Sequence, residues 1–315
     1  MKKSLANFLF LLCTLSLVSS CEKQDIKKST GEATASVSEQ NTASAACLPV
    51  YYQLVVDPGS GNSFIFKTSG SPTALPVTLS AFFGSCGDNA IRLIGSCTPI
   101  TFVTGIATDP SGTVLWGTTG PASNVPNSLL RIPIADVSLS SPVPLVSSCG
   151  IVLNVSDIEY NTVNGRFYAI NRGAPAVNNR IVQIQPTAVT NVICLTATVP
   201  VNRRLRGLTF GCNGQGYVMQ TSGPNGKIWS FNLASGATGA PTCNYGLVAP
   251  GAPAATAPEM GLHFDCSCIG KFITGNYDPV PGTTLLTDGM PVCIGAPSYL
   301  SLTGVIKPTV DFAKP

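Results

Sequence analysis

The sequence is poor in charge and in histidine. Only 10% of its 315 residues are Asp, Glu, Lys or Arg, and His263 is the one histidine. Any Ser/His or Cys/His nucleophilic scheme would therefore have to use His263, and a histidine-rich metal motif is excluded. The sequence also lacks a glycine-rich phosphate loop. From Cys47 onward basic and acidic residues nearly balance without a basic stripe, so nucleic acid is not an expected partner.

Long apolar runs are also scarce, and the only one is Leu5–Val18. No other uncharged stretch suits a helical span of about 20 residues. Two lysines precede this run, and two serines followed by Cys21 come after it. This order resembles the lipobox signal peptide of bacterial lipoproteins, although Val18 stands where Leu is more usual. The resemblance implies cleavage before Cys21, diacylglycerol on its sulfur and acylation of its amino group, for example by palmitate. The alternative is an ordinary signal peptide with an incidental cysteine.

The residues after Cys21 predict a tether. Glu22-Lys23-Gln24-Asp25 is similar to the surface-export signal of some diderm lipoproteins, which implies anchoring to the outer membrane at the cell surface; the periplasmic face is the alternative. Residues 22–46 are rich in Ser, Thr, Ala, Glu, Gln and Lys and lack aromatics. A segment of this composition has too little apolar surface to fold. The expected organisation is a signal peptide (1–20), a lipidated cysteine with a flexible tether (21–46) and a folded domain (47–315).

A unit of about 50 residues recurs in the folded domain. Its clearest copy, Ser156–Gln185, has three short β runs, the first two separated by an Asn164-Gly165 turn. Similar first runs start at residues 53, 105, 157, 207 and 261. An aromatic residue follows each start by ten or eleven positions: Phe64, Trp116, Tyr168, Tyr217 and Phe272. Several strands repeated at this period are typical of a β-propeller.

The expected fold is therefore all-β, a β-propeller of about five four-stranded blades, with six as the alternative. The architecture resembles the broad NHL and YVTN kind of propeller repeat protein. The periodic aromatics are expected to pack between neighbouring blades. Thr303–Pro308 reads as another first strand, so we expect residues 301–308 and 49–57 to share one sheet and close the ring. Gly70–Asn89 is an insertion without a predicted place.

Ten cysteines remain after Cys13 and Cys21, an even number that predicts disulfides in an exported chain. Six are periodic: Cys47, Cys97, Cys149, Cys194, Cys243 and Cys293. The other four are Cys86, Cys212, Cys266 and Cys268. Equivalent positions on adjacent blades should be too far apart for a disulfide, so periodic cysteines should mostly pair with the others, Cys86–Cys97 first. Cys47–Cys293 would be the exception, at the closure. Buried reduced cysteines are the alternative.

Two groups of residues are candidates for a site. Asp157, Glu159, Glu259, His263 and Asp265 lie on or beside predicted first strands, which line the channel of a propeller, where lactonase-type propellers gather carboxylates around a metal. The alternative is that these are solvated or turn-capping groups and that His263 is structural. Arg203, Arg204 and Arg206 could contact an acidic ligand or form a solvated rim. No catalytic residue, cofactor or metal is expected.

These features predict a membrane-anchored extracytoplasmic lipoprotein whose propeller serves as a non-catalytic binding or scaffold module for a protein or glycan. The alternative is a lactonase- or hydrolase-like enzyme with a metal in the central channel. A purely structural envelope protein is a third possibility.

Overall fold

The structure is a computed structural model of the 315-residue chain. It describes residues 51–57, 59–69, 78–81, 84–172, 179–198, 205–220, 226–233, 238–245, 261–265, 271–277, 284–289, 298–302 and 309–313. All of them belong to the second of the two units into which the chain divides, Thr42–Pro315. The predicted signal peptide, lipidation site and tether lie outside these residues. No helix in the described part is long and apolar enough to cross a membrane.

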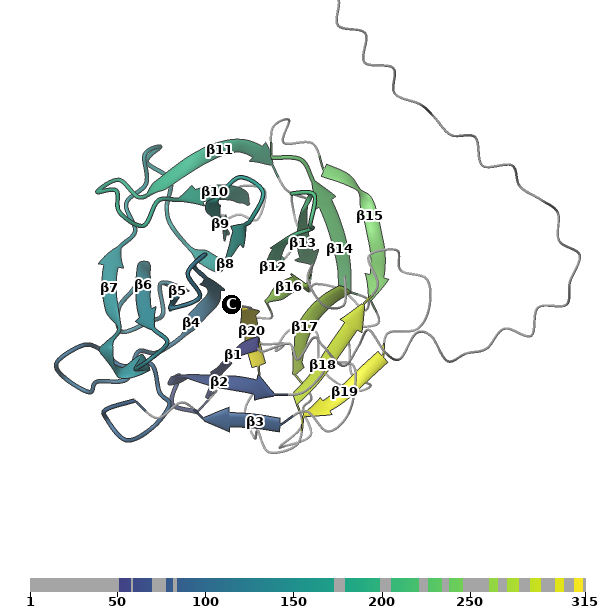
Figure 1. The fold of residues 1–315 in the computed structure, drawn as a ribbon. Coiled ribbons are helices and arrows are strands. Elements are labelled where there is room, and N and C mark those ends of the chain that lie inside the picture. Colours follow the sequence, from purple (N-terminus) through teal and green to yellow (C-terminus); the bar gives the residue numbers. More distant parts are fainter. Residues whose placement is uncertain are drawn as a thin grey trace, which may run out of the picture. The chain divides into compact units, whose positions relative to one another are not determined.

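The described residues are almost entirely β-strand, as predicted, and form five antiparallel sheets of four strands each (Figure 1). Sheet I has the order β20-β1-β2-β3 (Thr309–Ala313, Tyr51–Val56, Ser63–Ser69, Thr78–Ala81). Sheet II contains β4–β7 (Val103–Thr108, Val114–Thr119, Ser128–Pro133, Ser141–Pro144). Sheet III contains β8–β11 (Val155–Asn161, Arg166–Asn171, Arg180–Ile184, Val192–Thr198).

Sheet IV contains β12–β15 (Leu205–Phe210, Gly216–Gln220, Gly226–Phe231, Thr238–Tyr245). Sheet V contains β16–β19 (Leu262–Asp265, Lys271–Tyr277, Thr284–Gly289, Ser298–Leu302). A short 3-10 helix, η2 (Val137–Leu139), lies between β6 and β7, and Asp136 caps it by accepting a hydrogen bond from Ser138 N.

The sheets surround a common centre, and one edge strand of each lies closest to it (Figure 1). These inner strands are β20, β4, β8, β12 and β16. Each contacts the inner strand of the next sheet, and β20 contacts both β16 and β4, so the contacts run in a cycle. Sheets arranged radially in this way are the architecture of a β-propeller.

Hydrophobic cores fill the spaces between neighbouring sheets. Tyr52 and Leu54 of sheet I pack with Ile106 and Leu115 of sheet II. Trp116 of sheet II packs into the core of sheet III, with its ring 6.2 Å from that of Phe167. The same layer continues with Tyr168 against sheet IV and Tyr217 against sheet V.

The predicted aromatic layer is therefore confirmed for Trp116, Tyr168 and Tyr217. Phe64 lies on β2, the third strand of its sheet, and pairs with Val55, so it does not occupy the equivalent position. The register gives that place to Tyr52, which lies opposite Ala313 as Trp116 lies opposite Ala107. In sheet V the backbone register pairs His263 with Ile273 and Phe264 with Phe272; the side chains of β17 lie outside the described part, so the prediction for Phe272 stays a prediction.

The chain ends pair in a different register from the predicted one. The strand beside β1 is β20, Thr309–Ala313, and not residues 301–308. Residues 298–302 form β19, the outer strand of sheet V. Because β20 occupies the inner position, the run from Gln53 to Asp57 belongs to the second strand of its sheet rather than the first. The prediction relied on the similarity of Thr303–Pro308 to the first strands. The repeat spacing, which places the next first strand near residue 311, was not used.

The first hairpin of sheet III is longer than a two-residue turn. β8 ends at Asn161 and β9 begins at Arg166, so residues 162–165 form the connection. The Asn161 side chain accepts a hydrogen bond from Val163 N, and Gly165 N donates to Asn161 O. Gly165 takes the left-handed conformation at φ 70°, which glycine adopts without steric cost.

The unplaced insertion contributes β3 and a segment, residues 84–101, that packs between sheets I and II. Ala90 of this segment forms an isolated β-bridge with Phe64 of β2. Ile91 and Ile100 are fully buried in the core between the two sheets. The predicted disulfide Cys86–Cys97 closes this segment, with Cα atoms 5.8 Å apart.

A second disulfide, Cys149–Cys194, joins two periodic cysteines, which were expected mostly to pair with the other four. The two are not at equivalent positions: Cys149 lies in the connection after β7, and Cys194 lies in β11. Backbone hydrogen bonds to Val192 hold that connection beside β11, which brings the Cα atoms within 6.1 Å. Cys212 is also disulfide-bonded. Cys47, Cys266, Cys268 and Cys293 lie outside the described residues, so the Cys47–Cys293 pairing stays a prediction; of Cys243 only the backbone, in β15, is described.

Candidate functional site

Two aspartates occupy equivalent positions on the inner strands. The corresponding residues are Gly105 on β4, Asp157 on β8, Gly207 on β12, Gly261 before β16 and Asp311 on β20. We call these five residues the glycine–aspartate layer. Asp157 and Asp311 are each only 1% exposed. Three glycines and two buried carboxyl groups therefore share one level of the centre.

Each carboxyl group accepts a backbone hydrogen bond from another sheet. Asp157 Oδ2 accepts from Leu208 N at 2.6 Å, and Asp311 Oδ2 accepts from Ile106 N at 2.7 Å. Because the inner strands are sheet edges, their centre-facing N–H groups have no ladder partner, and burial without one would be costly. The two aspartates satisfy these donors and join β8 to β12 and β20 to β4.

Glycine at the other positions makes room for the carboxyl groups. A Cβ atom on Gly105 would collide with Asp157 Oδ1 and lie 2.7 Å from the Asp157 Cα atom. A Cβ atom on Gly261 would collide with the carboxyl group of Asp311. Glycine at residues 105 and 261 is therefore a steric requirement of the two carboxyl groups, whereas a Cβ atom on Gly207 would collide with Leu262.

The surroundings of Asp157 favour its protonated form. Burial raises the pKa of Asp157 well above its ordinary value, and the negative charge of Asp311 and a hydrogen bond between the two carboxyl groups raise it further. The hydrogen bond from Leu208 N acts in the opposite direction, and the charge of Glu159 adds a smaller rise. Two carboxyl groups in one buried place favour sharing a single proton.

A second layer lies two residues further along the same strands. There the Glu159 Oε2 atom on β8 lies 3.5 Å from the His263 Nδ1 atom on β16, and both residues are 8% exposed. Burial raises the pKa of Glu159, and His263 opposes that rise. The Tyr51 ring meets the His263 ring edge to face at 6.0 Å. Between these two strands Thr209 Oγ1 accepts a hydrogen bond from Phe264 N, which joins β12 to β16.

The structure thus brings together three of the predicted channel residues, Asp157, Glu159 and His263. Glu259 lies outside the described residues, and only the backbone of Asp265, in β16, is described. The prediction missed Asp311. Its position follows Gly261 by 50 residues, close to the repeat period, so the spacing alone could have found it.

The predicted arginine rim is wrong for Arg206. This residue lies on the inner strand β12, where every side chain is buried, and it is itself 5% exposed. The prediction placed it in a loop because it follows two other arginines. Arg203 and Arg204 lie outside the described residues. Arg172, from the preceding repeat, is half-buried and donates a hydrogen bond to Asn154 Oδ1 at 3.1 Å.

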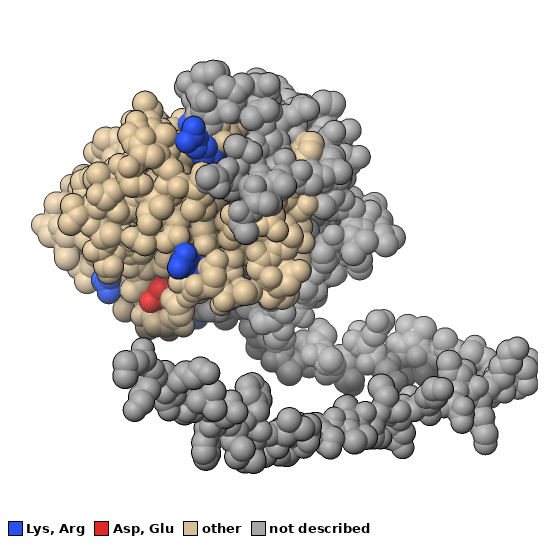
Figure 2. Space-filling model, turned by 90° about the horizontal axis from the view of Figure 1, so that it is seen from above, with Lys and Arg blue, Asp and Glu red and all other residues tan. Residues whose placement is uncertain are grey.

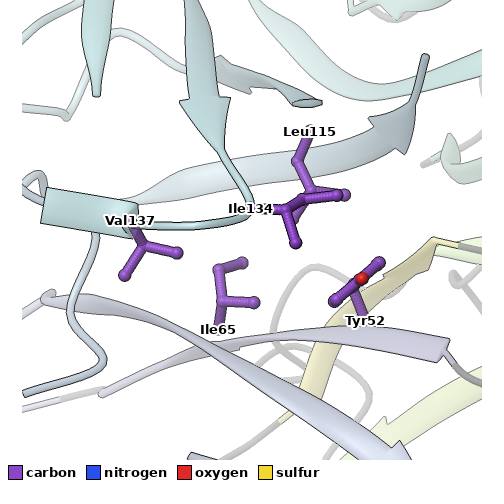
Figure 3. Close-up of a pocket in the computed structure, with 5 residues that line it drawn as sticks. All are labelled: Tyr52, Ile65, Leu115, Ile134 and Val137. Atoms are coloured by element: carbon purple, nitrogen blue, oxygen red, sulfur yellow. The ribbon is translucent and has the colours of Figure 1, made fainter. Parts of the chain in front are cut away.

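An apolar gap between sheets I and II is lined by Tyr52, Ile65, Leu115, Ile134 and Val137 (Figure 3). It encloses no volume that would accommodate a water molecule. The side chains in Figure 3 converge from β1, β2, β5 and the η2 segment, and they belong to the core between the two sheets. This gap is a packing feature and not a ligand pocket.

The carboxyl groups of the centre do not form a metal site in the part of the chain that the structure describes. No group of three or more His, Cys, Asp or Glu side chains there is arranged to hold a metal ion. Asp157 and Asp311 bind backbone N–H groups instead, and Glu159 pairs with His263.

No protein-family model matches the chain, and no curated protein matches its sequence. Among solved structures, the chain is similar to one described as a gluconolactonase, with 12% identity over 84% of this chain and 81% of that one, at a TM-score of 0.43. It is similar to TolB from Acinetobacter baumannii with 13% identity over 84% and 66%, also at 0.43. Regucalcin from Agrobacterium tumefaciens gives 12% identity over 82% and 76%, at 0.40. Resemblance at this level identifies no function, and the fold described above rests on the strand pairings.

Proposed function

We propose that the chain is a lipid-anchored extracytoplasmic protein whose all-β domain is a non-catalytic binding or scaffold module for a protein or glycan. In this proposal the five sheets are the blades of a propeller closed by the pairing of β20 with β1. The head stands on a tether that begins at a lipidated Cys21, at the cell surface.

One observation carries the non-catalytic part of this proposal. The inner-strand carboxyl groups of Asp157 and Asp311, the best candidates for metal ligands or a general acid, are almost fully buried and bind backbone N–H groups of other sheets. Groups used in this way hold the sheets together and are not open to a substrate. In a binding module of this fold, the ligand would meet the outer surface or the loops.

The surface suits a partner that is uncharged or that carries charges of both signs. Charged side chains are sparse over the described part of the face in Figure 2, and the chain as a whole carries only 10% charged residues. The most exposed large apolar residues, Val152 and Val189, are 87% and 92% exposed. A neutral glycan or a protein surface suits such a face better than a polyanion.

The alternative enzyme has one feature in its favour, the raised pKa of Glu159 beside His263. Full-length protein in detergent, measured for bound metal and for lactone hydrolysis with added divalent cations, tests it. We expect no stoichiometric metal and no turnover, with Glu159→Gln unchanged. Stoichiometric metal that disappears in Glu159→Gln would replace the binding module with the enzyme.

The binding role is tested with the same protein on glycan arrays and in pull-down from envelope extracts, using heat-unfolded chain as the control. We expect a saturable ligand for the folded chain alone. Cys21→Ala tests the anchor: it should abolish incorporation of labelled fatty acid and release the chain from membranes. Retention of label in Cys21→Ala would overturn the anchor without affecting the binding proposal.

A further inference from the structure

We propose that the carboxyl pair Asp157–Asp311 is a proton-dependent latch that holds the C-terminal strand β20 at the centre of the domain. The latch would make the attachment of this strand sensitive to pH. It concerns the stability of the fold and is independent of the ligand proposed above.

The position of β20 explains why it needs a latch. It has five residues and pairs with β1 along one edge only, while its other edge faces the centre. From that side, Asp311 Oδ2 accepts a hydrogen bond from Ile106 N of sheet II. The Asp311 carboxyl group also forms a hydrogen bond with the carboxyl group of Asp157 on sheet III. One side chain therefore connects the end of the chain to two other sheets.

The bond between the two carboxyl groups requires a proton. When one group is protonated, its O–H can donate to the other, and each group keeps an oxygen for its backbone N–H. When both are ionised, neither can donate, and two negative charges repel each other in a site with almost no exposure to water. Loss of the proton therefore weakens the link that holds β20.

The two charges that shift the pKa of Asp157, those of Asp311 and Glu159, are both negative. The second negative charge that acts on Asp157 is that of Glu159, which pairs with His263. The inner strand β4 and its neighbour β5 carry no titratable residue. The remaining strands packed against β8 and β20 carry Tyr51, Tyr52, Arg166, Tyr168, Arg206, His263, Asp265, Lys271 and Tyr277.

The direction of the pH effect follows from the raised pKa of Asp157. The folded protein binds the proton at pH values where the unfolded chain has released it. The resulting stability is fully present below the unfolded pKa and is lost as the pH rises through the folded pKa. Each pH unit in that window changes the opening equilibrium by up to about tenfold per proton.

Hydrogen exchange of the full-length protein in detergent tests the latch through the backbone amides of residues 309–313, from about pH 5 to about pH 9. The test variants are Asp157→Asn and Asp311→Asn, in which the amide N–H can replace the shared proton. The control is Asp109→Asn, which changes a partly exposed carboxylate in the β4–β5 turn. Exchange rates of the same amides are compared between the wild type and each variant, so that the intrinsic pH dependence of exchange cancels.

We expect the amides of β20 to lose protection as the pH rises in the wild type and in Asp109→Asn, and either test variant to remove this loss. The same pH profile in wild type and both variants would overturn the latch. If the variants do not fold, infrared spectroscopy of the wild type gives a second test. The infrared band of a protonated carboxyl group should persist at pH values above those at which an ordinary Asp ionises. It should disappear on alkaline titration together with the protection of β20. Absence of that band would also overturn the proposal.

Discussion

Asp157 and Asp311 show how a single residue type can join sheets that share no backbone ladder. Each carboxyl group reaches the N–H of a residue on another inner strand, and each occupies space that a glycine leaves open. Hydrogen bonds to a charged or proton-sharing group are stronger than those between neutral groups. Gly105 and Gly261 matter because a side chain in their place would displace the carboxyl groups from these donors.

We expect Gly105→Ala to destabilise the domain by about 2–3 kcal/mol, because the new Cβ atom would overlap the Asp157 side chain and approach its backbone. Urea unfolding measures the change. The matched control is Gly120→Ala, another buried glycine, whose Cβ atom would lie 3.4 Å from its nearest neighbour. Equal stability of the two variants would show that the layer tolerates a side chain at residue 105.

At the scale of the element, the segment 84–101 stands out because it has little regular structure and yet reaches the core. Ile91 and Ile100 are fully buried between sheets I and II, and Asp88 pairs with Arg92 near the surface. Asp136, which caps η2, also accepts a hydrogen bond from Ser85 N, and hydrogen bonding to Ser138 lowers the pKa of Asp136 to about 2. The disulfide Cys86–Cys97 restrains the part of the segment that strands do not hold.

Replacing both cysteines, as Cys86→Ser with Cys97→Ser, should lower the free energy of unfolding by about 3 kcal/mol, because the unfolded chain regains the entropy of an open loop. The comparison is Cys149→Ser with Cys194→Ser. That disulfide closes a longer loop, 45 residues apart against 11, and its loss should cost about 1 kcal/mol more. Chemical unfolding without reductant measures both. A negligible loss in the first variant would mean that packing alone orders the segment.

At the scale of the whole molecule, the contacts of the inner strands run in a cycle that depends on β20. This strand comes from the end of the chain but lies in the sheet of the first three strands. Without it, β1 would present an unpaired edge at the centre, which is a place for misassociation between chains.

Deletion of residues 309–315 should therefore abolish cooperative unfolding and promote aggregation, because sheet I loses its inner strand and sheets II and V lose a neighbour. Size-exclusion chromatography and thermal unfolding measure the effect. The control is deletion of Lys314 and Pro315 alone, which leaves β20 complete. A monomeric product that unfolds at the wild-type temperature would contradict the structural role of this strand.

Sequence periodicity predicted most of the elements correctly. The three predicted β runs of Ser156–Gln185 correspond to β8, β9 and β10, and the predicted first runs at residues 105, 207 and 261 correspond to β4, β12 and β16, because alternating apolar side chains and short turns are local signals. The outer strands β11, β15 and β19 were not predicted. An outer strand packs on fewer neighbours, so its sequence is less constrained.

The candidate site was predicted only in part. Asp157, Glu159 and His263 were found because they lie in recognisable first strands, and Asp311 was missed because the last strand was placed on residues 303–308. The arginine cluster was misread for Arg206 because neighbouring charges in a sequence resemble a loop, whereas burial depends on the whole sheet.

The sequence by itself determined that this chain is an all-β protein built from repeats. Strand alternation, turns and a 50-residue period can all be recognised from the order and spacing of residues in the sequence. Only the tertiary structure decided which strand completes sheet I, that Cys149 meets Cys194, and that Asp157 meets Asp311. These pairings join residues from 45 positions apart (Cys149 and Cys194) to 261 positions apart (Tyr52 and Ala313), and no local pattern specifies them. They follow from the packing of all five sheets around one centre.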